Sequence, residues 1–80
     1  MFSEEKLKAV MGAILEVDPD GIGPATSTDT VERWDSLKHM RLIIALEEAF
    51  DVTIPDEEVA TMTSYEIVKL VVMEQARGKR

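Results

Sequence analysis

The sequence of 80 residues predicts an all-α protein: a small four-helix bundle, with three main helices, one short helix and a long first loop. Three stretches place apolar residues at the i, i+3, i+4 and i+7 spacing of one helix face. No stretch alternates apolar and polar residues convincingly, as a half-buried strand would. Residues that cap helices and residues that form turns lie between these stretches. We therefore expect one helical domain over residues 1–80.

The first predicted helix covers residues 4–16, with Ser3 as its N-cap and two acidic residues, Glu4 and Glu5, in its first turn. A serine oxygen can accept a hydrogen bond from an unpaired first-turn amide, and the helix dipole favours acidic residues there. The inward face of this helix is predicted from five apolar residues at helical spacing: Leu7, Val10, Met11, Ile14 and Leu15.

A long loop is predicted over residues 17–33, which lack a helical period and contain many turn-forming residues. Loops of this length are unusual in a compact domain unless something ties them down. We expect Ile22, Val31 and Trp34 to do so by inserting into the bundle. Residues 18–21 (DPDG) faintly resemble a calcium loop, but the EF-hand spacing is absent, so no metal site is predicted.

The central helix is predicted to start after Trp34 and to run to Phe50, with Asp35 as its cap. Ser36 then lies where the helix is electropositive and its amides are unpaired, so a phosphate on this serine would be stabilised. One side of the helix has a core-facing pattern: Leu42, Ile43, Leu46 and Phe50. A second side carries Leu37, Met40 and Ile44. Because the first side already faces the core, we expect the second to be an exposed docking surface.

Two further helices are predicted after residue 53. The short one begins at Pro55, has acidic residues 56–58 in its first turn and ends near Thr61. The last one begins at a capping box over residues 63–66 (TSYE) and ends by Gly78. Its inward side is predicted from Ile67, Leu70 and Val71, with Met73 as a further candidate.

Composition limits the partners that this chain can have. Sixteen acidic and nine basic residues give a net charge of −7, which disfavours nucleic acid and favours protein partners with basic patches. No apolar run reaches the roughly 18 residues needed to span a membrane, and no signal peptide is evident, so we expect a cytoplasmic monomer. The chain has no cysteine, so any thioester chemistry would need a thiol from an added group.

The tripeptide Asp35-Ser36-Leu37 at the start of the central helix, followed by Leu42, residues 46–48 (LEE) and Phe50, resembles the modification-site helix of acyl carrier proteins. The resemblance continues through residues 54–58 (IPDEE) and the closing helix. It implies that Ser36 carries a 4′-phosphopantetheine arm from coenzyme A, whose thiol holds acyl groups as thioesters. It also implies a phosphopantetheinyl transferase as a partner. Asp35, with Leu37 as part of the motif, would help this enzyme and its metal ion to engage the serine.

The same resemblance implies a surface that acyl-transferring and acyl-modifying enzymes recognise. The predicted docking residues are Leu37, Met40, Arg41, Ile44, Glu47 and Glu48. A pocket for the acyl chain between the last three helices is predicted from a second set, for which ordinary core packing is the alternative: Leu46, Val52, Ile54, Val59, Met62 and Ile67. Lys38 and Arg41 are basic where housekeeping members of the family tend to be acidic, and Trp34 replaces a small residue. These departures favour a specialised carrier.

We therefore predict a carrier for fatty-acid, lipid or polyketide-like biosynthesis that has no catalysis of its own. Two alternatives remain open at this point: a carrier of aminoacyl or peptidyl groups, and an unmodified helical interaction module. A hydrolytic dyad of Ser36 and His39 is disfavoured, because neither a group that orients the histidine nor an oxyanion hole is evident. We expect His39 to be a packing or surface residue.

Overall fold

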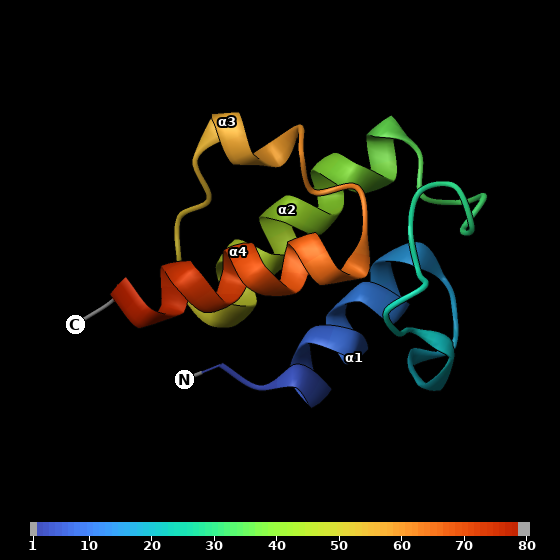
Figure 1. Ribbon diagram of the computed structural model, residues 1–80, viewed down its shortest axis with the longest axis horizontal. Coiled ribbons are helices and arrows are strands. Elements are labelled where there is room, and N and C mark those ends of the chain that lie inside the picture. Colours follow the sequence, from blue (N-terminus) through green and yellow to red (C-terminus); the bar gives the residue numbers. More distant parts are fainter. Residues whose placement is uncertain (1, 79–80) are drawn as a thin grey trace.

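The computed structural model describes residues 2–78, and within them four α-helices surround one hydrophobic core (Figure 1). The helices are α1 (Glu4–Leu15), α2 (Ser36–Phe50), α3 (Asp56–Val59) and α4 (Tyr65–Gly78). One turn of 3-10 helix, η1 (Pro19–Gly21), lies in the long first loop. The predicted all-α bundle is confirmed, with α3 as its short helix.

Helix α1 begins and ends close to the predicted residues. The Ser3 hydroxyl oxygen accepts a hydrogen bond of 3.2 Å from the Lys6 amide. The helix ends at Leu15, and its C-cap, Glu16, adopts a left-handed conformation with φ 62°. Of the predicted inward face, Leu7, Met11 and Leu15 are fully buried, while Val10 and Ile14 are partly buried against the core.

The long first loop is held by η1 near its start and by three apolar side chains along its length and at its end. Asp18 caps η1 by accepting a hydrogen bond of 2.9 Å from the Asp20 amide, a turn of helix that the sequence pattern did not predict. Ile22 and Trp34 are buried in the core, and Val31 is partly buried against it, as expected.

The same loop pairs with the connection between α3 and α4. The Thr28 amide donates to the Thr63 carbonyl at 2.9 Å, and the Tyr65 amide donates to the Thr26 carbonyl at 2.8 Å. An isolated antiparallel bridge joins Ser27 and Ser64. These hydrogen bonds hold the loop against the start of α4. They also give polar groups of the loop backbone hydrogen-bond partners from outside the loop.

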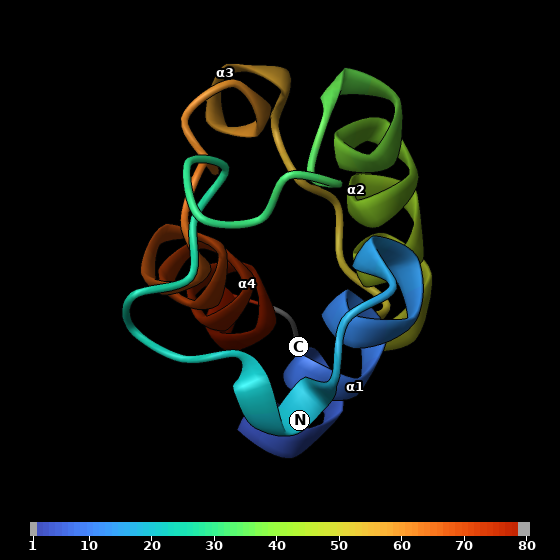
Figure 2. The same ribbon diagram turned by 90° about the vertical axis from the view of Figure 1, so that its right-hand side faces the viewer.

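Helix α2 has the two faces that its sequence predicts. Asp35 caps it, and the four expected core residues are buried: Leu42, Ile43, Leu46 and Phe50. The first turn of α2 lies at the same end of the molecule as α3, at the top of both Figure 1 and Figure 2. This arrangement brings residues at the start of α2 close to α3.

Two predictions about helix α4, its cap and the direction of Leu70, are wrong. Its cap is Ser64 rather than Thr63, because the Ser64 hydroxyl accepts a hydrogen bond of 3.3 Å from the Ile67 amide. Leu70, predicted to face inward, is 62% exposed. The buried face is formed instead by Tyr65, Val68, Val71 and Val72, while Ile67 and Met73 are partly buried.

A polar contact joins α1 to α4. The Tyr65 hydroxyl donates to Glu4 Oε2 at 2.6 Å, and Lys69 Nζ lies 3.3 Å from the same oxygen. The Tyr65 hydroxyl, followed by Lys69, lowers the pKa of Glu4 below its usual 4.5, while burial and the adjacent carboxylate raise the pKa of Tyr65. No helix within residues 2–78 is long and apolar enough to cross a membrane.

Candidate functional site

Ser36 is the first residue of α2, and its side chain is exposed. The preceding Asp35 satisfies two amides of the first turn: its carboxylate accepts from the Lys38 amide at 2.9 Å, and its carbonyl accepts from the His39 amide at 2.8 Å. Within residues 2–78, the amides of Ser36 and Leu37 have no hydrogen-bond partner. An anion attached to the Ser36 hydroxyl would therefore lie beside unpaired donors and the positive end of the helix.

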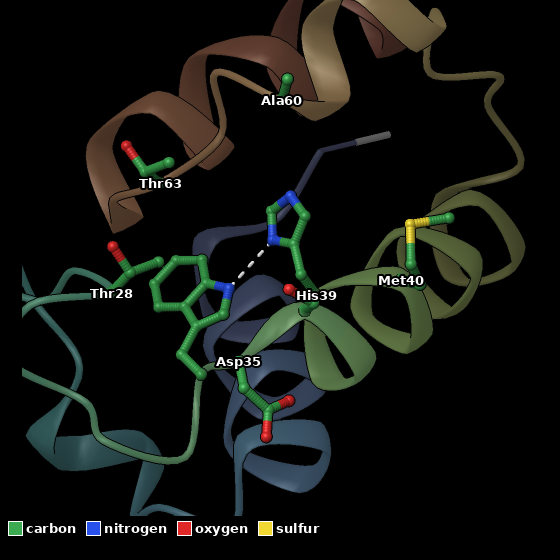
Figure 3. A pocket seen from close by; sticks show the side chains of 8 residues that line it. Thr28, Asp35, His39, Met40, Ala60 and Thr63 are labelled. Carbon is green, nitrogen blue, oxygen red and sulfur yellow. Dashed lines mark hydrogen bonds between the residues drawn. The ribbon is translucent and has the colours of Figure 1, made fainter.

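A cavity of about 490 Å³ opens next to this serine (Figure 3). It is bounded by the long loop, the first turn of α2 and the segment that follows α3. Its walls mix hydroxyl, carboxylate and imidazole groups with apolar side chains, and they consist of Thr28, Trp34, Asp35, Ser36, His39, Met40, Ala60 and Thr63. A flexible group attached to Ser36 would have this space directly beside its point of attachment.

Both ring nitrogens of His39 are engaged. The Trp34 indole Nε1 donates to His39 Nδ1 at 3.0 Å, which is the dashed line in Figure 3. His39 Nε2 lies 2.7 Å from the carbonyl oxygen of Val59 in α3. An indole N–H can only donate and a carbonyl can only accept, so these partners assign a neutral imidazole with its proton on Nε2.

This arrangement decides how His39 can act. Neither of its nitrogens is left to take a proton from Ser36, so the two residues do not form a hydrolytic dyad. Of the two roles expected for His39, packing or surface, the structure shows packing, with specific contacts that sequence reasoning missed. It joins the long loop, α2 and α3 at one point. The only sequence signal was that an indole N–H and an imidazole lie five residues apart across a helix start.

The second apolar side of α2 is exposed as predicted. Leu37 is 61%, Met40 53% and Ile44 55% exposed. Arg41 and Glu48, two other predicted docking residues, are also exposed. We call Leu37, Met40 and Ile44 the apolar stripe; its role in docking remains a prediction.

Two charged residues near the apolar stripe are held by intramolecular contacts. Lys38 is paired with Glu16 at the end of α1, and Arg33 lies 3.1 Å from the same carboxylate. The hydrogen bond from Lys38, together with both positive charges, lowers the pKa of Glu16. Glu47 is half-buried, and its carboxylate accepts a hydrogen bond of 2.9 Å from the Ile54 amide. Arg41, in contrast, has no ion-pair partner among residues 2–78.

The residues expected to line an acyl pocket lie in or against the core. Leu46, Ile54 and Met62 are buried, while Val52, Val59 and Ile67 are partly buried. None of the six lines the cavity beside Ser36, so their role as a pocket remains a prediction. Within the described part of the chain, no cluster of histidine, aspartate and glutamate side chains could hold a metal ion.

Known proteins match this chain in both sequence and fold. A family model described as a phosphopantetheine attachment site matches residues 5–71. An acyl carrier protein from Thermosynechococcus vestitus is 48% identical over 54 residues, which are 68% of this chain and 67% of that protein. The solution NMR structure of holo acyl carrier protein from Geobacter metallireducens has a similar fold, with a TM-score of 0.83 at 22% identity. The match covers 96% of this chain and 88% of that structure.

Proposed function

Because this chain belongs to the acyl carrier proteins, a family with a phosphopantetheine attachment site, we propose that Ser36 is its attachment residue. Members of this family are carriers without catalysis of their own. The observation that supports Ser36 is its exposed hydroxyl at the first position of α2, beside two amides that have no hydrogen-bond partner within residues 2–78. The phosphodiester of a phosphopantetheine arm on this oxygen would lie where the helix favours negative charge.

The residues around Ser36 fit such a group. Asp35 uses its carboxylate and its carbonyl to hold the first turn, which leaves the amides of Ser36 and Leu37 available to a phosphate. The arm supplies the thiol that this cysteine-free chain lacks. The protein itself supplies a rigid point of attachment, and tethering raises the local concentration of the cargo at a partner's active site.

We further propose that the apolar stripe is the docking surface for the transferase and for acyl-transferring or acyl-modifying enzymes. Its side chains are large, apolar and more than half exposed, which is the character of a contact surface rather than of a core. Met40 adds a flexible side chain that adapts to different partners. Met40→Ala should therefore reduce the rate of modification while changing stability by less than about 0.5 kcal/mol. A sharp loss of stability with an unchanged rate would assign Met40 to the core.

The charges beside the apolar stripe support a specialised carrier, because a different charge pattern selects different partners. Lys38 is partly buried and paired with Glu16, whereas Arg41, next to Met40 and Ile44, is exposed and has no ion-pair partner among residues 2–78. A partner that docks on this surface would need a negative or neutral group opposite Arg41, while basic patches would meet the acidic residues that follow. Fatty-acid, lipid or polyketide-like biosynthesis in the cytoplasm is the setting that we propose.

The attachment is tested by the mass of the intact protein after incubation with a phosphopantetheinyl transferase and coenzyme A. The wild type should gain one phosphopantetheinyl group, and Ser36→Ala should gain none while it stays folded. Ser3→Ala is a matched control, because Ser3 also lies at a helix start but caps α1. This control should still be modified, although losing the cap costs about 1 kcal/mol of stability. A wild type that stays unmodified beside a carrier that reacts would refute the proposal.

A further inference from the structure

We infer that His39 is a positioning residue that closes the passage between α2 and α3, so that the arm's cargo stays in the open cavity beside Ser36. Long alkyl chains are then kept out of the core, and the cavity takes short acyl groups that carry polar substituents. This inference rests on Ser36 being the attachment residue.

The position of His39 on α2 carries the first step of the argument. Ser36, His39, Ile43 and Leu46 follow one another at helical spacing, so they lie along one side of the helix. Leu46 lies about 15 Å from Ser36 along the axis, and His39 lies about 4.5 Å from it, at 1.5 Å per residue. A chain that enters from Ser36 and runs between α2 and α3 toward Leu46 must therefore pass His39.

The passage is closed at that point by a direct bond. His39 Nε2 is 2.7 Å from the Val59 carbonyl, so the imidazole spans the space between the two helices. The other ring nitrogen is held by Trp34, whose side chain is only 4% exposed. Figure 3 shows His39 reaching toward the segment that carries Ala60. To rotate the ring away, a chain would have to break both hydrogen bonds. The sheltered Trp34 indole N–H would then lose its acceptor, and the Val59 carbonyl would keep only the Met62 amide, at 3.3 Å, as a donor.

The space behind the histidine is already filled. Leu46 and Met62 are fully buried and Ile54 is 4% exposed, so an alkyl chain would have to displace packed side chains. In front of the histidine, the cavity of about 490 Å³ needs no rearrangement. A cargo that tolerates water therefore enters the open cavity at a lower cost in free energy than the packed core.

The walls of that cavity indicate the class of cargo. Thr28 and Thr63 bring hydroxyl groups and Asp35 brings a carboxylate, while Trp34 and Met40 provide apolar surface. Hydroxyl and amide groups of a short acyl chain find hydrogen-bond partners here, which a plain alkyl chain cannot use. Short hydroxylated or amide-bearing acyl groups match this mixture better than long saturated ones.

Two methionines allow the two locations to be told apart. Met40 lines the open cavity and Met62 lies in the core, so NMR spectra of protein labelled at methionine methyl groups report each site separately. The wild type is loaded at Ser36 with an octanoyl or a 3-hydroxybutyryl group, and loading is first verified by mass. A protein that does not load refutes the attachment proposal rather than this inference.

With loading verified, both cargoes should shift the Met40 methyl signal and leave the Met62 signal in place. An octanoyl group that shifts the Met62 signal in the wild type would overturn the inference. This measurement requires no substitution, so it decides the point even if a variant fails to fold.

Two variants then assign the closure to His39. Because an asparagine amide reaches about as far as Nδ1, His39→Asn keeps an acceptor for Trp34 but loses the contact with Val59. His39→Gln reaches as far as Nε2 and keeps a donor for the Val59 carbonyl. Octanoylation should shift the Met62 signal and raise Tm by about 4 °C or more in His39→Asn. In His39→Gln, octanoylation should leave the Met62 signal in place, as in the wild type. A Met62 signal that does not shift in octanoylated His39→Asn would overturn the role of His39.

Discussion

Replacing Gly12 by alanine should destabilise the protein, although helix propensity alone predicts the opposite. A Cβ at this position would lie 2.8 Å from the Val17 carbonyl oxygen and 2.9 Å from Pro19 Cγ. Alanine gains about 1 kcal/mol over glycine in a helix. Forcing the neighbouring backbone away costs about 1–3 kcal/mol, and weakening the 3.0 Å hydrogen bond from the Val17 amide to the Gly12 carbonyl costs about 1 more.

The balance is a loss of about 1–3 kcal/mol, so Tm should fall by at least about 4 °C in a domain of this size. Thermal unfolding followed by circular dichroism measures it. Ala9→Gly, at an exposed position of the same helix, should cost about 1 kcal/mol through propensity alone. Gly23→Ala, where an added Cβ meets nothing within 4 Å, should change stability by less than about 0.5 kcal/mol. A Gly12→Ala protein with an unchanged or higher Tm would refute the reasoning.

Two further predictions concern carboxylates. Glu47→Ala should lower the free energy of unfolding by about 1–2 kcal/mol, because the Ile54 amide loses its acceptor. Glu48→Ala, at an exposed position, should change the free energy of unfolding by less than about 0.5 kcal/mol. Urea unfolding measures both, and equal effects would contradict a structural role for Glu47. Hydrogen bonds hold the pKa values of Glu4 and Glu16 below 4.5, so the stability from these groups is complete above that pH and is lost as pH falls through the lowered pKa values. Between about pH 7 and about pH 3, the Tm of a variant with glutamine at both positions should therefore fall less than the Tm of the wild type. An identical fall in Tm would count against these contacts.

The helices were predictable because the signals that define them are local. Caps at Ser3 and Asp35, together with apolar residues at helical spacing, placed the starts of α1 and α2 at the residues observed. Burial of Trp34 and Ile22 followed from their being large apolar residues in an otherwise polar loop. The position of Ser36 followed from the same cap.

The inward face of α4 was less predictable, because this helix is apolar on more than one side. Ile67, Leu70 and Val71 satisfy a helical spacing as well as Val68 and Val72 do, and only the packing of the other helices chooses between them. The result is that Leu70 lies in solvent.

The contacts around the site could not be read from the sequence at all. The Lys38–Glu16 pair joins residues 22 apart, and the partner of His39 Nε2 is a backbone carbonyl 20 residues away. Neither has a compositional signal, because both arise only when α1 and α3 approach the start of α2. For the same reason, the hydrogen bond between the Glu47 carboxylate and the Ile54 amide was not predicted, while the place of Glu47 on a docking surface stays a prediction.

The acceptor that His39 meets in α3 belongs to the main chain, and this has an evolutionary consequence. Residue 59 can mutate to other side chains without removing that acceptor, so drift there leaves the contact intact. Positions 34 and 39 have no such freedom, because an indole N–H needs an acceptor and the imidazole needs a donor at Nδ1. In homologous sequences, tryptophan and histidine at these two positions should therefore be gained and lost as a pair, a co-variation that would identify carriers with the same closed passage.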